Sequence, residues 1–114
     1  MTPDCVPGAE VDLAALQRLR DALGAETVAL LVGECAQDLE EACAALSNPS
    51  VDADTIQKLA HKMAGLLGQY ACPDAAAFAR GLANGGADAA LAARERLVER
   101  AGACIRELQA LATT

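Results

Sequence analysis

The sequence predicts an all-α fold, and the composition and the spacing of the apolar residues are the observations behind this prediction. Hydrophobic residues make up 54% of the 114 residues, whereas aromatic residues make up only 2%. Most hydrophobic residues are alanine, leucine or valine; alanine and leucine have high helix propensity, and runs of alternating β-branched residues are missing. Apolar residues recur every three or four positions, the period of one helix face. A chain of this length should form one domain around one core.

Two helices are expected in the first half of the chain. A short helix should run from about Asp12 to Leu23 and end at Gly24. A longer helix should run from about Glu26 to Leu46, before a turn at residues 47–50. The apolar residues of this second helix have the spacing of a helix packed in a bundle, and they are Val28, Val32, Cys35, Leu39, Ala42 and Leu46.

The third helix should run from residue 52 or 54 to about Ala71. Its apolar face comprises Ile56, Leu59, Ala60, Met63, Leu66, Leu67 and Tyr70. Gly65 and Gly68 leave open a second possibility, in which the helix ends just before Gly65. The apolar spacing continues unbroken through both glycines and favours a single helix.

Two further helices are expected after a turn at residues 72–74. The fourth helix is short and runs to about Ala83, where Asn84-Gly85-Gly86 ends it. Asp88 should cap the start of the fifth helix. The buried stripe of the fifth helix is expected to comprise Leu91, Val98, Ala101, Ile105, Leu108 and Leu111.

Short connections between these helices indicate that consecutive helices are antiparallel neighbours. We therefore expect the second to fifth helices to form an up-down-up-down antiparallel four-helix bundle, with the short N-terminal helix capping one end. Residues 1–10 should form a loose tail, and residues 11–114 a single domain. The tail lacks the positive charge and apolar centre of a signal peptide, and the chain has no apolar run of about 18 residues that would predict a transmembrane helix.

Charge and cysteine content argue against several classes of function. A net charge of −7 and a pI near 4.5 disfavour nucleic acids and anionic membranes as partners. The five cysteines include no CxxC pair, so we expect neither disulfides nor a metal site, and we expect a reducing cytoplasm. Cys35, Cys43 and Cys104 should be small core residues. One sufficient core favours a monomer.

His61 is the only histidine, and helical spacing places it outside the core. At roughly 100° per residue, the apolar face of the third helix centres about 170° away from His61, so the imidazole should point outward. Gly65 and Gly68 follow on the same face. A glycine within a helix costs roughly 1 kcal/mol relative to alanine, and this loss leaves the ring open to the surface of another protein. The simplest alternative is an exposed histidine without a function.

These residues resemble the signature of histidine-containing phosphotransfer (HPt) domains. That signature is an alanine-histidine pair, an apolar residue two positions after the histidine, a glycine four positions after it and frequently another at seven. The matching residues are Ala60, His61, Met63, Gly65 and Gly68. The size and helix order of the whole chain also fit the family. The family often has a lysine three positions after the histidine, where this chain has Ala64.

The resemblance implies a phosphorelay intermediate of two-component signal transduction, a phosphoryl carrier rather than an enzyme with its own ATP site. The Nε2 atom of His61 would accept a phosphoryl group from an aspartate of one receiver domain and pass it to an aspartate of another. The implied partners are response-regulator receiver domains and a hybrid histidine kinase. This chain would bind no cofactor, because in this family the receiver carries the Mg²⁺.

Lys58 and Lys62 are candidates for neutralising the phosphoryl group in place of the missing lysine. Lys58 lies on nearly the same face as His61, whereas Lys62 needs its long stem to reach the ring. Arg80 and Asn84 on the fourth helix are candidates for a hydrogen bond to the imidazole or the phosphate. The exposed receiver-docking face should include Asp54, Gln57, Lys58, Ala64, Gly65, Gly68, Gln69 and Cys72.

Two alternatives from other classes stay open. An HPt-like adaptor would bind or sequester a kinase or a receiver without carrying phosphate, and Ala64 in place of the lysine is the reason to keep it. The dimerisation bundle of a histidine kinase also presents an exposed histidine, but an acidic residue usually follows that histidine. Here Lys62 follows His61, and autophosphorylation from ATP alone would be needed to support this alternative.

Overall fold

The structure is a computed structural model that describes residues 10–112 of the chain. These residues form five α-helices and no strand, so the predicted all-α fold is confirmed for them. The helices are α1 (Leu13–Leu23), α2 (Ala25–Leu46), α3 (Ala53–Gln69), α4 (Pro73–Asn84) and α5 (Ala87–Ala112). None of the five combines the length and the apolar character that crossing a membrane requires.

Local side-chain and backbone chemistry defines where the first three helices begin and end. The Asp12 carboxylate accepts a hydrogen bond from the backbone N–H of Ala15 (3.1 Å), and Asp52 accepts one from Thr55 (2.8 Å). These bonds satisfy donors that the first turn of a helix leaves unpaired. Gly24 joins α1 to α2 with a φ of 89°, which suits glycine. The predicted bounds of α1 and α2 agree with the structure within one residue.

Two predicted helix ends differ from the structure. The third helix ends at Gln69 rather than at Ala71, because Ala71 adopts a left-handed φ of 69° that turns the chain toward α4. Asp88 does not cap α5 but lies inside its first turn. The prediction of this cap is wrong because the carbonyl of Gly86 already accepts a bond from the N–H of Ala90, so the helix begins earlier.

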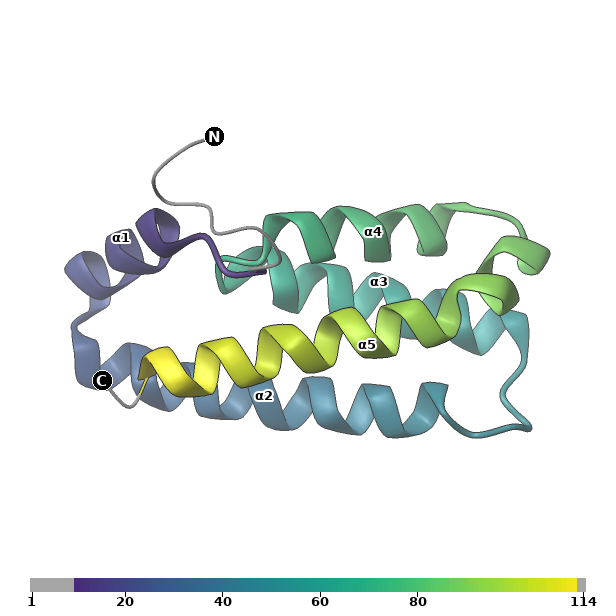
Figure 1. Ribbon diagram of the computed structural model, residues 1–114, viewed down its shortest axis with the longest axis horizontal. Coiled ribbons are helices and arrows are strands. Elements are labelled where there is room, and N and C mark those ends of the chain that lie inside the picture. The colour runs from purple at the N-terminus through teal and green to yellow at the C-terminus, as the bar shows by residue number, and fades with distance from the viewer. Residues whose placement is uncertain (1–9, 113–114) are drawn as a thin grey trace.

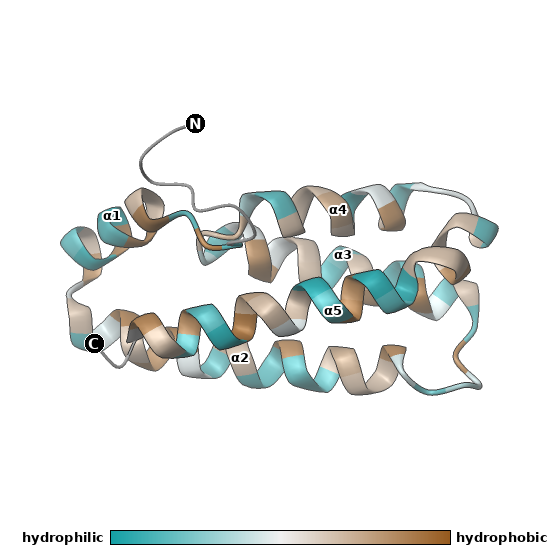
Figure 2. Ribbon diagram, in the orientation of Figure 1, coloured by the Kyte–Doolittle hydropathy of each residue, from teal (hydrophilic) through white to brown (hydrophobic). Residues whose placement is uncertain are grey.

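The four helices α2 to α5 pack against one another around a shared core and lie side by side along the length of the molecule (Figure 1). The most extensive contact is between α3 and α4, while α5 contacts α2, α3 and α4. Helix α1 contacts α2 at one end of the molecule. Just before α1, the Asp12 N–H donates to the Ala71 carbonyl (2.7 Å) in the turn between α3 and α4. Every helix carries both hydrophobic and hydrophilic residues, as expected for helices with one buried face (Figure 2).

The buried face of α2 agrees with its prediction, whereas that of α5 agrees only in part. All six residues predicted for α2 are at most 3% exposed. The buried residues of α5 include Ala90, Leu97, Ala101, Cys104, Ile105 and Leu108. Leu91 is 47% exposed, and Val98 and Leu111 are only partly buried. The prediction for Leu91 is wrong. It chose the larger of two neighbouring side chains, whereas Ala90 is the one that shares a helix face with the buried Leu97.

Glu10 fastens the start of the described chain to α5. Its backbone N–H donates to the Glu107 carboxylate (2.8 Å), and its own carboxylate pairs with the Arg100 guanidinium (3.2 Å). The same guanidinium lies over the Phe78 ring of α4, 5.3 Å from its centroid. Glu10 therefore belongs to the packed part of the molecule. The remainder of the tail predicted for residues 1–10 lies outside the described residues.

Four cysteines lie within the described residues, and all four are free thiols. Cys35 and Cys104 are buried, as predicted, and so is Cys72. Cys43 is only half-buried at the edge of the core, so its prediction holds in part. Burial raises the pKa of the Cys35 thiol to about 12, so this side chain stays protonated near neutral pH and packs as a small apolar residue.

Candidate functional site

His61 lies on the exposed face of α3. The helix continues through Gly65 and Gly68, so the alternative in which it ends before Gly65 is wrong. The opposite face is fully buried at Ile56, Ala60, Met63 and Leu67. His61 itself is exposed, which confirms the orientation that the helical spacing predicted. Burial of one face therefore holds the helix in place, while the imidazole stays accessible.

Two hollows flank His61, and both are bordered by α3 and α4. The first has a volume of about 340 Å³ and is lined by Asp54, Gln57, Lys58, His61, Ala83 and Asn84. The second has a volume of about 290 Å³ and is lined by His61, Ala64, Gly65, Arg80, Ala83 and Asn84. Because His61, Ala83 and Asn84 border both hollows, the imidazole stands between them.

Lys58 and Gln57 both line the first hollow but differ in their interactions: Lys58 forms a weak, exposed ion pair, whereas the Gln57 amide is hydrogen-bonded to the backbone. The Lys58 Nζ atom lies 3.0 Å from an Asp54 carboxylate oxygen, with side chains that are 77% and 73% exposed. An ion pair this exposed contributes little stability, so Lys58 can exchange partners. The Gln57 Nε2 atom donates to the carbonyl of Gly85 and ties α3 to the end of α4. Lys58 is therefore placed to meet an anion on His61, whereas Gln57 has a structural partner.

Arg80 lines the second hollow, and its side chain extends from α4 toward Gly68 of α3. A Cβ atom at Gly68 would lie 3.9 Å from Arg80 Nη1 and 3.7 Å from the Ala76 methyl carbon. A Cβ atom at Gly65 would have no such neighbour within 4 Å. Gly68 therefore lies beside the Arg80 guanidinium, and Gly65 is the more open of the two glycines.

Two residues that were expected on the exposed docking face are buried. Ala64 is only 4% exposed, because α4 packs against its side of α3. Cys72 is buried because the chain turns inward after Ala71 and begins α4. The prediction that Ala64 and Cys72 are exposed is therefore wrong. Gln69 is exposed as expected, and Lys62 is exposed but borders neither hollow.

The packing of α4 brings both of its candidate residues to His61. Arg80 borders the second hollow, and Asn84 borders both. Ala83 was not among the predicted site residues, and its small side chain leaves room beside the ring. A signal for this group was available, since Arg80, Ala83 and Asn84 are three and four residues apart and share one face of a helix.

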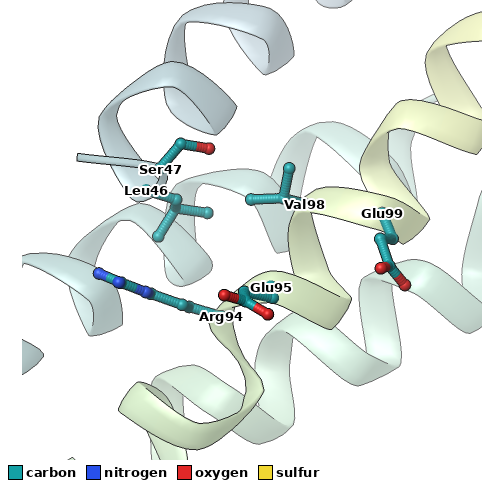
Figure 3. Close-up of a pocket in the computed structure, with 6 residues that line it drawn as sticks. All are labelled: Leu46, Ser47, Arg94, Glu95, Val98 and Glu99. Carbon is teal, nitrogen blue, oxygen red and sulfur yellow. The ribbon is translucent and has the colours of Figure 1, made fainter. Parts of the chain in front are cut away.

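A third hollow, of about 290 Å³, lies away from His61 and is lined by Leu46, Ser47, Arg94, Glu95, Val98 and Glu99 (Figure 3). Figure 3 shows the Arg94 side chain extending from α5 toward the end of α2. Its Nη1 atom donates to the carbonyl of Asn48 (3.3 Å). Arg94 therefore holds the turn between α2 and α3, and we assign this hollow a structural role.

The surroundings of His61 suit a nucleophilic imidazole. A neutral imidazole keeps a lone pair on one ring nitrogen; Lys58 and Arg80 supply positive charge, and the Asn84 amide can donate hydrogen bonds. Among the described residues, no three His, Cys, Asp or Glu side chains gather as they would around a metal ion. Comparison of the chain with protein-family models, curated proteins and solved structures gave no match.

Proposed function

We propose that this protein is a phosphorelay intermediate, which accepts a phosphoryl group on His61 from a receiver-domain aspartate and passes it to an aspartate of a second receiver. The observation that carries the proposal is the placement of His61. Its exposed imidazole lies on a well-packed helix beside the open Gly65, between two hollows that contain cationic side chains. The resemblance of His61 and its glycines to the HPt signature supports the same function.

Transfer to His61 is a substitution at phosphorus. The Nε2 lone pair attacks the phosphorus atom of an aspartyl phosphate, an N–P bond forms as the acyl O–P bond breaks, and the aspartate leaves as a carboxylate with the bonding electrons. The ring then loses its added positive charge when Nδ1 releases a proton to water. Transfer to the second receiver reverses these steps. Such reactions depend mainly on positioning and charge neutralisation, which a rigid helical protein can help to provide.

In this proposal the receiver docks on the side of α3 and α4 that carries the two hollows. Gly65 leaves the approach to His61 open, and Gln69 adds an exposed polar side chain on the same helix. The receiver supplies the Mg²⁺, and a hybrid histidine kinase supplies the phosphoryl group. This chain contributes the nucleophile and the surrounding positive charge.

We further propose that α2 to α5 form an antiparallel up-down-up-down bundle within a single, monomeric domain. The short connections and the mutual contacts of these four helices support this topology. Free thiols at the buried Cys35, Cys72 and Cys104 support a reducing compartment, which for a phosphorelay is the cytoplasm.

The test is phosphoryl transfer from a panel of receiver domains, each phosphorylated beforehand by a hybrid kinase. Because His61 is the only histidine in the chain, acid-labile and alkali-stable label on the wild type reports on this one side chain. We expect the label on the wild type and none on His61→Gln. Circular dichroism of His61→Gln should match that of the wild type, because an exposed side chain contributes little to folding.

Other outcomes of this experiment would point elsewhere. Label on His61→Gln at the level of the wild type would contradict the proposal. A receiver that binds both proteins without labelling either would identify the adaptor that binds without carrying phosphate. Label obtained from ATP alone would identify a histidine kinase bundle.

A further inference from the structure

Building on the proposed function, we propose that Arg80 binds the phosphoryl group on His61 by moving from its position beside Gly68 into the hollow that it shares with His61. In this way the guanidinium of α4 supplies positive charge to a nucleophile on α3. Ala64 stands where HPt domains often have a lysine, and it borders the same hollow. Because α4 packs against Ala64, the side chains nearest to this position come from α4, and Arg80 is the cation among those that line the hollow.

The shared hollow has room for the group that would form there. Its volume is about 290 Å³, and apart from His61, Arg80 and Asn84 its lining consists of the small residues Ala64, Gly65 and Ala83. A phosphoryl group on the ring can therefore enter without displacing a large side chain. The amide of Asn84 borders the same space and can donate a further hydrogen bond.

Arg80 has no competing ion pair in the part of the chain that the structure describes. The ion pairs there join Lys58 to Asp54 and Arg100 to Glu10. A phosphoryl group brings nearly two negative charges and three acceptor oxygens. A planar guanidinium donates two parallel hydrogen bonds to such oxygens, which makes arginine well suited to this partner. The negative charge of a phosphoryl group on His61 therefore attracts the Arg80 guanidinium toward the ring.

The glycines of α3 provide the path for this movement. The Arg80 Nη1 atom lies near Gly68, which is seven residues, or roughly 10 Å along the helix axis, from His61. Between these positions α3 carries the exposed Gly65, where an added Cβ atom would have no neighbour within 4 Å, and the buried Ala64, whose methyl group lines the hollow. No long side chain blocks the guanidinium. Gly65 and Gly68 thus leave space for the movement of Arg80 as well as for the approach of a receiver domain.

Chemical phosphorylation tests the proposal without a partner protein. Phosphoramidate transfers its phosphoryl group to a histidine nitrogen: the new N–P bond forms, the P–N bond of the reagent breaks, and ammonia leaves. Phosphorus NMR follows the modification of His61, and proton–nitrogen NMR follows the arginine Nε–H signals. The signal of Arg80 is assigned from its loss in Arg80→Lys. We expect this signal to shift on phosphorylation of the wild type and not in treated His61→Gln, while the Arg106 signal stays in place.

Transfer rates from a phosphorylated receiver give a second readout. Arg80→Ala should slow transfer to His61 by roughly tenfold or more, because the phosphoryl oxygens lose a charged donor. Arg80→Lys should restore part of the rate. The matched control is Arg106→Ala, which removes the same charge from an exposed position on α5 and should leave the rate unchanged.

An unshifted Arg80 signal on protein with phosphorylated His61 would overturn the proposal, and so would a wild-type transfer rate in Arg80→Ala. A wild-type protein that phosphoramidate labels but no receiver labels would contradict the phosphorelay function alone. The Arg80 signal would then still decide whether Arg80 binds the phosphoryl group. If neither phosphoramidate nor any receiver modifies His61, both proposals are overturned, since each requires an accessible and nucleophilic ring.

Discussion

Side chains around His61 divide into those that hold the helices together and those that remain free to act. Gln57 belongs to the first kind, because its amide is bonded to the carbonyl at the end of α4. Lys58 belongs to the second, because both side chains of its ion pair with Asp54 are exposed to solvent. A helical wheel identifies Lys58 from the sequence. Arg80 comes from another helix, and its distance from the ring depends on how the helices pack.

Among single residues, the buried Cys35 thiol should make stability depend on pH in alkaline solution. Burial raises its pKa from 9.0 to about 12 in the folded protein. Between these values the unfolded chain loses the thiol proton while the folded protein keeps it, so the free energy of unfolding falls as pH rises. Urea-unfolding midpoints should therefore decline as the pH is raised above the unfolded thiol's pKa, and this decline should be shallower in Cys35→Ala.

The slope of this decline is the relevant result, not the midpoint itself. Cys35→Ala also leaves a small cavity, which lowers stability at every pH. The pKa of Cys72 is also raised, by a hydrogen bond with the Cys104 thiol and by burial, and burial raises the pKa of Cys43, so part of the decline should persist in the variant. Equal slopes in the wild type and in Cys35→Ala would contradict a raised pKa of the Cys35 thiol in the folded protein.

At the scale of the helix, α3 combines a buried face with glycines on its exposed face. Gly65→Ala should stabilise the protein by up to about 1 kcal/mol, because alanine has the higher helix propensity and its methyl group has open space. The same methyl group would narrow the approach to His61. We therefore expect a higher urea-unfolding midpoint together with a slower transfer of phosphate from a receiver.

Gly102→Ala is the matched control for this prediction. Its added methyl group on α5 would meet only the flexible end of Arg106, at 3.3 Å, and Gly102 borders neither hollow beside His61. This variant should keep the wild-type transfer rate and should not lose stability. If Gly65→Ala is stabilised and still transfers at the wild-type rate, Gly65 is not needed for the approach to His61.

At the scale of the whole molecule, Glu10 connects the start of the described chain to the middle of α5. Its side chain is only 13% exposed, so the ion pair with Arg100 is better shielded from water than the one between Lys58 and Asp54. Glu10→Ala should lower the free energy of unfolding by about 1–2 kcal/mol, because Arg100 loses its partner. Urea unfolding measures this loss.

Glu41→Ala removes an exposed carboxylate from α2 and serves as the control, with an expected change within about 0.5 kcal/mol. Phosphoryl transfer should be unaffected in Glu10→Ala, because Glu10 borders neither hollow beside His61. Equal stability of the two variants would show that the contacts between Glu10 and α5 do not stabilise the protein.

Local sequence features were enough to predict the all-α class, nearly all helix bounds and the outward orientation of His61. Helix propensity, capping residues and the apolar period are properties of neighbouring positions, and they act before any helix meets another. The packing of the helices determined that Ala64 is buried and that Arg80 and Asn84 line hollows together with His61. It also decided that Ala90 rather than Leu91 faces the core. Each of these outcomes depends on the rotation of one helix against its neighbours, which is set by how their side chains pack together.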